Sequence, residues 1–530
     1  MQLLTYGFLL FAAAVLVLYY LIPGKYQWIL LLAASLAFYL GAGPGGLLCL
    51  FVSVFSTWGL ALKIGALTRH STEEIKAKGL AGQEKKEAVL KVKKRQRRLM
   101  QLGLLLNFGI LLVLKYTNFL LENVNGIIRR FGYEFEMVHW LLPLGISYYT
   151  LQSCGYLIDV CRRKYEPERN PARYALFVMY FPQMTQGPVC RYDEMRTQLS
   201  EAHPFAWRNI ERGLLRTLWG LFKKMVVSDR IAPAALAIAG APDGFRGIWV
   251  WIGMFAYTIW MYGDFTGGID IIMGISEMLG ISLPENFDHP FFSRSMAEFW
   301  RRWHMSLMRW LREYIFFPVS MSGAAGKLSG FFRKRFGKGA GRRVPLYMAT
   351  VTVWLAAGLW HGASWNFVCW GMANCFVLLL SQELTPLLKK IRRKTGFNDT
   401  GICGVLQVGR TFLIFCLLEM FEYYPLARVP ELFVSMFAEF RLSGLQSFGA
   451  VLPELGLTAA DAAVLLISVL FMMAVGVADV CGAIKKRDTG EFEAPAAARF
   501  LIIYGLFLAV LIFGVYGPGY SASSFIYNQY

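Results

Sequence analysis

Long apolar segments, separated by short polar stretches, run along most of this 530-residue chain. A helix needs about 20 mainly apolar residues to cross a membrane. The pattern predicts an all-α polytopic membrane protein with about eleven crossings, plus re-entrant or interfacial helices where a segment cannot cross alone. The apolar start has no basic leader before it, so we expect a first membrane helix rather than a removed signal. The candidate segments are residues 4–22, 27–42, 45–66, 100–121, 138–160, 174–189, 213–228, 246–263, 266–283, 346–360, 363–384, 403–421, 462–482 and 498–516.

Two of these segments, 138–160 and 174–189, contain helix-breaking residues. Pro143 lies in the first segment, and Pro182 and Pro188 lie in the second. Broken helices at membrane depth are tolerated only where protein or a wet cavity covers the freed backbone groups. We therefore expect both segments to be interrupted.

The composition argues against a soluble protein. Hydrophobic residues make up 56% of the chain and charged residues only 17%, whereas soluble domains carry about 25% charged residues. The formal net charge is +19, but the basic residues lie in short runs between apolar segments, as in the cytoplasmic loops of membrane proteins. These runs are not interleaved with aromatic residues that could stack on bases, so we expect no nucleic-acid partner. The chain is expected to form one integral membrane domain, residues 1–530.

Three basic runs, residues 67–99, 327–343 and 389–394, are expected to be cytoplasmic loops of a multi-pass protein in the cell membrane. The longest, 67–99, has two interpretations. It is either a helix that lies against anionic lipid headgroups or a solvated segment that only determines topology. Membrane lipids are expected partners in both cases.

The sequence predicts neither a metal site nor a disulfide framework. The nine cysteines are scattered and odd in number, and they contain no CxxC pair. Most lie in apolar segments, where cysteine behaves as a small hydrophobic residue. No internal repeat is present, so the inverted repeat common in secondary transporters has no support.

Segment 298–314 combines aromatic and basic residues around His304. As one helix, it would place its aromatic residues on one stripe with cations on both flanks. This pattern predicts an interfacial helix with its aromatic face inserted and its cations toward headgroups or an anionic ligand. The alternative is a simple headgroup anchor. The stripe consists of Trp300, Trp303, Leu307, Trp310 and Tyr314, and the flanks of Arg301, Arg302, Arg309 and Arg312.

Segment 352–371 surrounds a single ionisable residue, His361, with apolar side chains. Ionisable residues in membrane segments are costly and are functional by default. A desolvated histidine tends toward the neutral form, which a general base requires. Gly358 and Gly362 flank His361 and leave room for a substrate or another part of the chain. The alternative is a structural histidine that bonds to a neighbouring helix.

Three acids lie in segment 262–280: Asp264, Asp270 and Glu277. Asp270 and Glu277 share one helical face, which must look into the bundle or a wet cavity. The acids are expected to pair with Arg301 or Arg302, or to orient a histidine. A purely structural ion pair is the alternative.

Several of these stretches resemble motifs of one family, the membrane-bound O-acyltransferases. Residues 142–195 resemble its N-terminal core motif, and residues 284–319 and 359–371 resemble its two histidine motifs. Residues 251–283 are similar to the acidic helix that precedes them. The ending FIYNQY resembles that of the alginate O-acetyltransferase branch. Two departures are Gln186, where relatives carry an apolar residue, and Asn528, where relatives carry an aromatic one.

The resemblance implies a helical fold around a central tunnel, with residues 100–380 as the catalytic core, 1–99 as N-terminal helices and 381–530 as C-terminal helices. It implies that His361 is the base, or binds the acceptor hydroxyl, and that His304 positions the donor thioester or polarises its carbonyl. The remaining implied site residues are Asp264, Asp270, Trp360 and Asn366 as supporting groups and Arg301, Arg302 and Arg309 as donor-binding groups.

The resemblance also implies a function. An acetyl group would pass from cytoplasmic acetyl-CoA, a donor substrate rather than a bound cofactor, to an exported or cell-surface polysaccharide such as alginate. An extracytoplasmic partner of the SGNH-hydrolase type would complete the transfer. The alternative within the family is D-alanyl transfer from a carrier protein to teichoic acid, against which the chain length and the helices after residue 400 argue. The alternative of another class is a transporter or flippase, which has no need of the lone His361.

Overall fold

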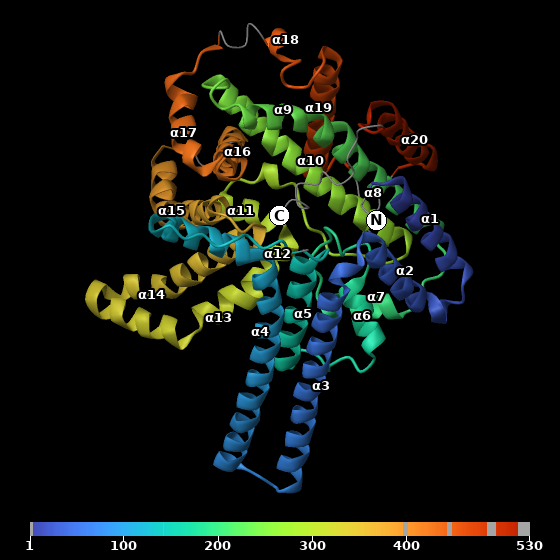
Figure 1. Cartoon of the computed structure of the whole chain (residues 1–530), viewed down its shortest axis with the longest axis vertical. Helices are drawn as coiled ribbons and strands as arrows, with labels where there is room; N and C mark the ends of the chain where they lie inside the picture. Colours follow the sequence, from blue (N-terminus) through green and yellow to red (C-terminus); the bar gives the residue numbers. More distant parts are fainter. Residues whose placement is uncertain (1–3, 141, 396–400, 443–447, 485–493, 518–530) are drawn as a thin grey trace. The chain divides into compact units, whose positions relative to one another are not determined.

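The computed structural model describes residues 4–140, 142–395, 401–442, 448–484 and 494–517, and within these ranges every regular element is a helix (Figure 1). The predicted all-α membrane fold is therefore confirmed. Seven helices in these ranges are long and apolar enough to cross a membrane. The expected total of about eleven crossings stays a prediction. The seven are Pro44–Ala77, Gly82–Phe131, Gly323–His361, Trp365–Ile391, Gly401–Tyr423, Ala459–Val480 and Ala496–Phe513.

The chain divides into two compact units. Unit 1 comprises Met1–Ile210 and Ile275–Pro284, and unit 2 comprises Glu211–Gly274 and Glu285–Tyr530. The expected division of a single domain at residues 99 and 380 stays a prediction. All nine cysteines are free thiols.

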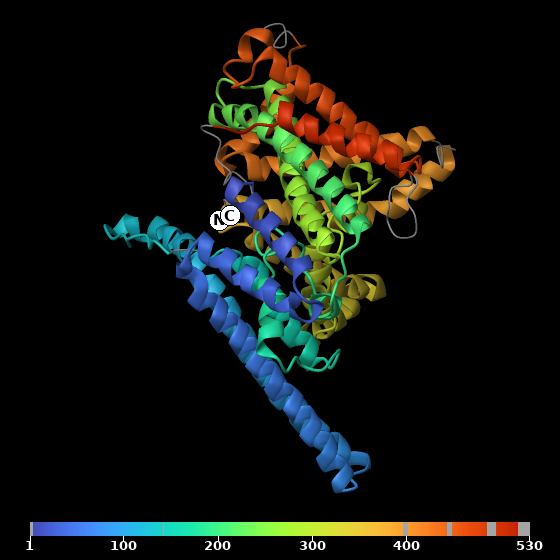
Figure 2. The same cartoon turned by 90° about the vertical axis from the view of Figure 1, so that its right-hand side faces the viewer.

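Unit 1 is built around a long antiparallel pair of helices, α3 and α4 (Figures 1 and 2). Gly103 of α4 lets the chain approach α5 closely, because a Cβ atom there would lie 2.4 Å from Leu157. Gln96 joins the pair farther out, where its amide donates to the Ile64 carbonyl at 3.1 Å and to Thr68 Oγ1 at 2.7 Å. The helices of unit 1 are α1 (Tyr6–Leu21), α2 (Gln27–Ala42), α3 (Leu47–Ala77), α4 (Gly82–Ile128), α5 (Ile146–Cys161), α6 (Pro171–Met179) and α7 (Tyr192–Ser200).

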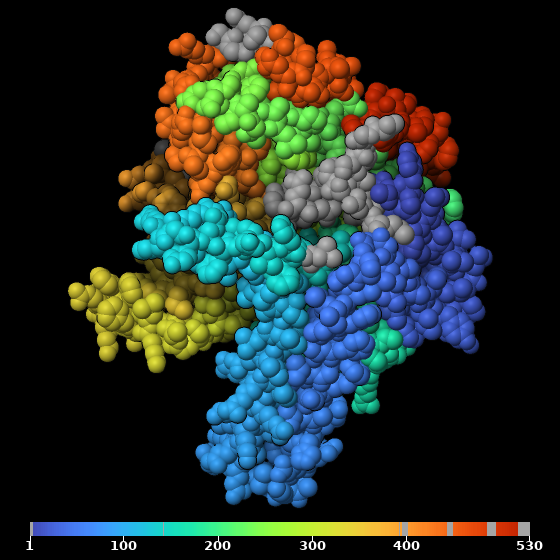
Figure 3. Space-filling view, viewed as in Figure 1, coloured from blue at the N-terminus to red at the C-terminus, as the bar shows by residue number. Residues whose placement is uncertain are grey.

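The basic run 67–99 forms the adjoining ends of α3 and α4, which lie side by side beyond the other helices of unit 1 (Figure 3). The expectation of one helix is therefore wrong, whereas contact of this run with anionic headgroups stays a prediction. The run continues two membrane helices without a break, so it leaves the apolar part of the pair along the helix axes. The basic run 389–394 is helical, within α15, and not a loop. The run 327–343 lies on two helical arms of α14 that meet at Gly337, where the backbone is not helical, so the connection in this run is confined to that kink.

The interrupted segments are confirmed. Helix α5 begins at Ile146, after Pro143, and α6 ends at Met179, before Pro182. Residues 180–190 are non-helical and buried. Gly145 sits where the two segments meet, because its φ is +69° and a Cβ atom there would lie 2.3 Å from the Met184 carbonyl.

Unit 2 carries the remaining helices, several of which pack backbone against backbone. A Cβ atom on Gly267 of α10 would lie 2.8 Å from the Gly220 carbonyl of α8. Helix α14 is bent at Gly337, whose φ is +87°. The helices of unit 2 are α8 (Trp207–Leu221), the π-helix η4 (Phe222–Ser228), α9 (Asp229–Gly240), α10 (Ile248–Met278), α11 (Met296–Arg302), α12 (Met305–Leu311), the π-helix η6 (Arg312–Phe316), α13 (Phe317–Ser320), α14 (Gly323–His361), α15 (Trp365–Thr395), α16 (Gly401–Tyr423), α17 (Val429–Ala438), α18 (Phe448–Val451), α19 (Ala459–Val480) and α20 (Ala496–Phe513).

Candidate active site

Segment 298–314 is not one helix, because the chain breaks at His304 between α11 and α12. His304 has a φ of +45°, in the left-handed region that side chains other than glycine rarely adopt. The aromatic stripe consequently turns into the protein, where Trp303 stacks on Phe299 at 5.5 Å and meets Phe287 edge-on at 5.1 Å. Trp300 and Trp310 are also buried. The predicted interfacial helix and the alternative headgroup anchor are therefore both wrong.

Asn286 holds His304 in place and fixes its tautomer. Asn286 Oδ1 accepts from the Ser306 backbone N–H at 3.0 Å, so this atom is the amide oxygen. His304 Nδ1 lies 3.3 Å from the same oxygen and must therefore be the donor. In the neutral ring the proton is then on Nδ1 and the lone pair is on Nε2. The sequence analysis did not identify Asn286, which no periodic pattern marks.

His304 is 2% exposed, and burial lowers its pKa well below the usual range, with a smaller contribution from the neighbouring His361. The ring is neutral at pH 7. Phe265 of α10 meets it edge-on at 4.9 Å. His304 is consequently a rigid, uncharged group whose Nε2 can accept a hydrogen bond or a proton.

His361 is the last residue of α14 and is 7% exposed. Phe367 fills the space that the flanking glycines leave, because a Cβ atom on Gly362 would lie 2.2 Å from its ring and one on Gly358 would lie 2.3 Å from its carbonyl. Of the two interpretations of these glycines, the close approach of another part of the chain is the one observed.

Trp360 contacts both histidines. Its ring centroid is 5.7 Å from that of His304 and 5.3 Å from that of His361, and both contacts are edge-to-face. The structure therefore brings together three residues that the sequence analysis assigned to the site, from two segments about 60 residues apart.

A second tryptophan, Trp370 of α15, covers another side of His361, with ring centroids 4.8 Å apart. Its indole Nε1 donates to Glu419 Oε1 of α16 at 3.0 Å. The sequence analysis identified neither residue. A signal was present for Glu419, since it is a carboxyl group in the apolar segment 403–421, and such groups are functional by default.

Asp264 and Asp270 pair with residues that the sequence analysis did not predict. Asp264 Oδ1 lies 2.5 Å from Lys224 Nζ, and Asp270 lies 2.6 Å from Lys223 Nζ and 3.0 Å from Arg216 Nε. The predicted partners were Arg301 and Arg302 or a histidine, so the structural ion pair is the interpretation that the structure supports. Both lysines lie on the π-helix η4, a distortion often found at functional sites. Their signal was two charges inside the apolar segment 213–228.

Asn366 anchors the start of α15 to the end of α16. Its Nδ2 donates to the carbonyls of Phe421 and Tyr424, both at 2.8 Å. The residue therefore positions the helix that carries Trp370, and it does so through backbone contacts.

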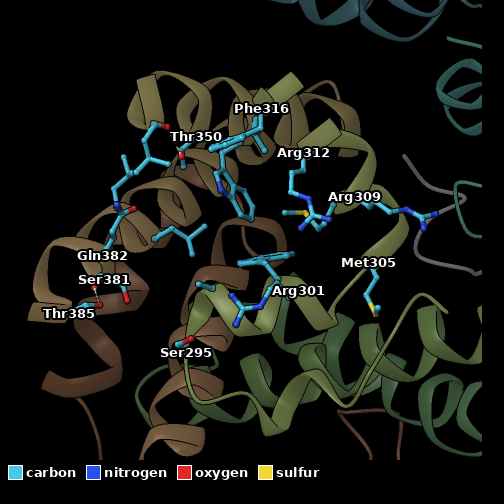
Figure 4. A pocket seen from close by; sticks show the side chains of 18 of the residues that line it. Ser295, Arg301, Met305, Arg309, Arg312, Phe316, Thr350, Ser381, Gln382 and Thr385 are labelled. Carbon is cyan, nitrogen blue, oxygen red and sulfur yellow. Dashed lines mark hydrogen bonds between the residues drawn. The ribbon is translucent and has the colours of Figure 1, made fainter. Parts of the chain in front are cut away.

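A cavity of about 800 Å³ opens beside the histidine segments (Figure 4). Arg301, Arg309 and Arg312 lie on one side of it, and Ser381 and Gln382 of α15 lie on the other. The lining is otherwise mainly apolar. It includes Trp300 and Trp354, which contact Trp370 at 5.7 and 5.9 Å, and Met305 and Ser306, which directly follow His304.

Arg302, the third predicted donor-binding arginine, is not among the residues that line the cavity. Its guanidinium pairs with Glu298 at 2.9 Å, one helical turn earlier. Among the described residues, no group of three or more His, Cys, Asp or Glu side chains is placed to hold a metal ion.

The chain is similar to known proteins of one family. The sequence model of the membrane-bound O-acyltransferase family matches residues 167–333. The chain is 35% identical over 364 residues to the "Probable alginate O-acetylase" of Azotobacter vinelandii, covering 68% of this chain and 64% of that protein. It is 34% identical over 378 residues to the corresponding protein of Pseudomonas putida, with 71% and 69% covered.

A third relative is named for another activity. The "Peptidoglycan O-acetyltransferase" of Helicobacter pylori is 32% identical over 315 residues, covering 54% of this chain and 56% of that protein. The chain thus spans a little less than two thirds of the length of the Azotobacter relative. The agreement of these matches with the histidine segments and the helical fold shows that the chain belongs to the membrane-bound O-acyltransferase family.

Proposed function

We propose that this protein transfers an acetyl group from acetyl-CoA to a hydroxyl group for the O-acetylation of an exported or cell-surface polysaccharide. The observation that carries the proposal is the pair of buried histidines that both contact Trp360. The activities for which the relatives are named, on alginate and on peptidoglycan, support a polysaccharide as the final acceptor. Between these two polymers the proposal makes no choice.

In the proposed reaction the acceptor oxygen attacks the acetyl carbonyl carbon. The C–O bond forms, the C–S bond breaks, and coenzyme A leaves as a thiolate. His361 takes the proton from the acceptor hydroxyl and returns it to the thiolate sulfur. The rings of Phe367 and Trp370 lie against the imidazole of His361 and shield it from water.

Two roles were expected for His304: positioning the donor thioester or polarising its carbonyl. The proposal assigns it the positioning role. Because its Nδ1–H is directed at Asn286, the neutral ring has no N–H on Nε2 to polarise the acetyl carbonyl. Nε2 instead accepts a hydrogen bond from an N–H or O–H of a substrate. His304 therefore positions a substrate, and His361 is the base.

The arginine-lined cavity is the proposed site for the donor. Arg301, Arg309 and Arg312 supply charge-assisted hydrogen bonds to the phosphates of coenzyme A. The apolar lining suits the long, weakly polar arm that carries the thioester. Met305 and Ser306 bring the cavity wall next to His304, which orients the donor toward the histidines.

The topology and the partner complete the proposal. The basic runs 67–99, 327–343 and 389–394 face the cytoplasm, where acetyl-CoA is made. The acceptor side then faces outward, and an extracytoplasmic SGNH-type protein completes delivery to the polymer. D-alanyl transfer from a carrier protein is the alternative that the test must separate.

The test uses inverted membrane vesicles from the native host, with its own gene deleted and replaced by the wild type or by His361→Ala. Labelled acetyl-CoA and a D-alanyl carrier protein are supplied separately, and label in the polysaccharide fraction is measured. We expect labelling from acetyl-CoA alone, and a loss of about 10²–10⁴-fold in His361→Ala at equal protein level. Labelling only from the carrier protein, or full activity of His361→Ala, contradicts the proposal.

A further inference from the structure

We propose that Glu419 is a positioning residue, whose hydrogen bond to the Trp370 indole holds that ring against the imidazole of His361. The inference rests on the proposed function, because it assigns His361 the role of base. It adds to the site a carboxyl group that lies 58 residues along the chain from His361 and does not touch it in the described contacts.

Burying the carboxyl group of Glu419 costs free energy. It lies in the membrane helix α16 and is 1% exposed. A carboxyl group in such a place loses its hydration and is retained where a hydrogen bond compensates for the loss. Trp370 supplies that hydrogen bond, with Nε1 at 3.0 Å from Oε1.

The indole of Trp370 contacts both His361 and two tryptophans that line the cavity. One side of it contacts the imidazole, with centroids 4.8 Å apart and planes at 55°. Other contacts reach Trp300 and Trp354, which line the cavity. A rotation of the Trp370 side chain therefore changes the space available to His361 and the shape of the cavity wall together.

The two side-chain torsions of Trp370 set the place of the indole ring and the direction of its N–H together, so a hydrogen bond to that N–H restrains the whole ring. The neighbouring Gly371 brings the α15 backbone close to α14, since a Cβ atom there would lie 2.4 Å from the Trp354 carbonyl. The backbone of Trp370 is thus fixed, and two side-chain torsions remain. The Glu419 hydrogen bond selects one pair of torsions, and with it the orientation of the face that His361 contacts.

The proposal needs an acceptor oxygen at position 419 and does not need a charge. Glu419→Gln retains an amide oxygen in the place of Oε1 and is expected to keep activity. Glu419→Leu and Trp370→Phe each remove one side of the hydrogen bond, and Trp370→Phe keeps a large ring. Because both changes abolish the same bond, the double variant should be no worse than either single variant.

A matched control is Trp260→Phe. Trp260 is buried in α10, and its Nε1 has no hydrogen-bond partner within the described ranges of the chain. The change therefore replaces an indole in the same unit by a smaller phenyl ring without removing a hydrogen bond. It separates the effect of the lost bond from that of the smaller ring.

Two measurements test the proposal. The first is acetyl transfer in the host vesicles with acetyl-CoA varied: Glu419→Leu and Trp370→Phe should lower kcat by about 10²-fold, the effect of misplacing a reacting group by about 1 Å, with KM unchanged. The second is the rate at which diethyl pyrocarbonate modifies His361, mapped by mass spectrometry on the purified full chain. It should rise in the same two variants and stay at the wild-type level in Glu419→Gln and Trp260→Phe.

Each other outcome overturns the inference. An equal loss in Glu419→Gln would assign a role to the charge or the proton of Glu419, and additive losses in the double variant would mean separate roles. If Glu419→Leu fails to reach the membrane, Trp370→Phe decides alone. The modification rate does not depend on catalysis, so unchanged rates refute the positioning role, whereas changed rates with an active His361→Ala refute only the proposed function.

Discussion

The buried lysine of the π-helix gives a prediction whose size follows from its contacts. Lys224 Nζ lies 2.5 Å from Asp264 and 2.6 Å from Asp229, and the side chains of Lys224 and Asp264 are 1% and 0% exposed. Lys224→Met removes the ammonium group that lies between these carboxylates. Removing one partner of a buried ion pair costs about 3–5 kcal/mol. At about 2 °C per kcal/mol for a large unit, the apparent Tm should fall by about 6–10 °C.

The adjacent lysine is the matched control. Lys223→Met also removes a buried ammonium group, but its partner Asp270 keeps Arg216 at 3.0 Å and is 16% exposed. We therefore expect a smaller loss. Asp264→Asn added to Lys224→Met should recover part of the stability, because it removes one of the two carboxylates.

The assay is the fraction of detergent-solubilised protein that stays monodisperse after heating, at a fixed heating time for every variant. An apparent Tm of Lys224→Met close to that of the wild type would refute the reasoning, as would equal losses in the two lysine variants. Either result would mean that hydration of the carboxylates, and not the lysine, compensates for their burial.

Four further outcomes are expected. Arg309→Gln should raise the KM for acetyl-CoA about tenfold or more, since a hydrogen bond to a charged group contributes about 1.5–3 kcal/mol; an unchanged KM removes Arg309 from the donor site. Asn286→Ala should lower kcat by up to about 10²-fold, because the imidazole of His304 loses its orientation, and normal kinetics would contradict that. The pKa of His304 is lowered in the folded protein, so the unfolded chain binds more protons below about pH 6.5; the stability should fall as the pH drops from 7 to 5.5, and less so in His304→Gln. Single cysteines at Lys94 and Lys334 should resist an impermeant maleimide in intact cells, and ready labelling of either would reverse the topology.

The apolar pattern predicted the helical membrane fold and the interruptions at Pro143 and Pro182, because hydrophobic segments and proline act locally. His361 could also be predicted from the sequence, since a lone ionisable residue in an apolar segment is conspicuous. The break at His304 could not be predicted, because the aromatic spacing on each side of it fits a helix. The left-handed backbone there is imposed by the contacts of Asn286, 18 residues earlier.

The partners of the buried charges could not be predicted for a related reason. Lys224 and Asp264 are 40 residues apart, and Trp370 and Glu419 are 49 residues apart. Each residue is recognisable in the sequence as a polar group whose loss of hydration on burial must be compensated by a partner. Which group compensates it depends on how the helices pack, and close approaches such as that of Gly220 and Gly267 decide this packing.

The α3–α4 pair has a consequence for the electrostatics at the membrane surface. The basic end of α4, residues 82–98, continues the apolar part of the helix and rises about 25 Å along its axis. The Debye length at physiological ionic strength is about 8 Å. Along this axis Lys85 lies about 20 Å from Arg98, which is more than two Debye lengths. At physiological ionic strength the charges at the two ends of the run are therefore largely screened from each other, so an anionic surface or molecule beside one end has little effect on the other.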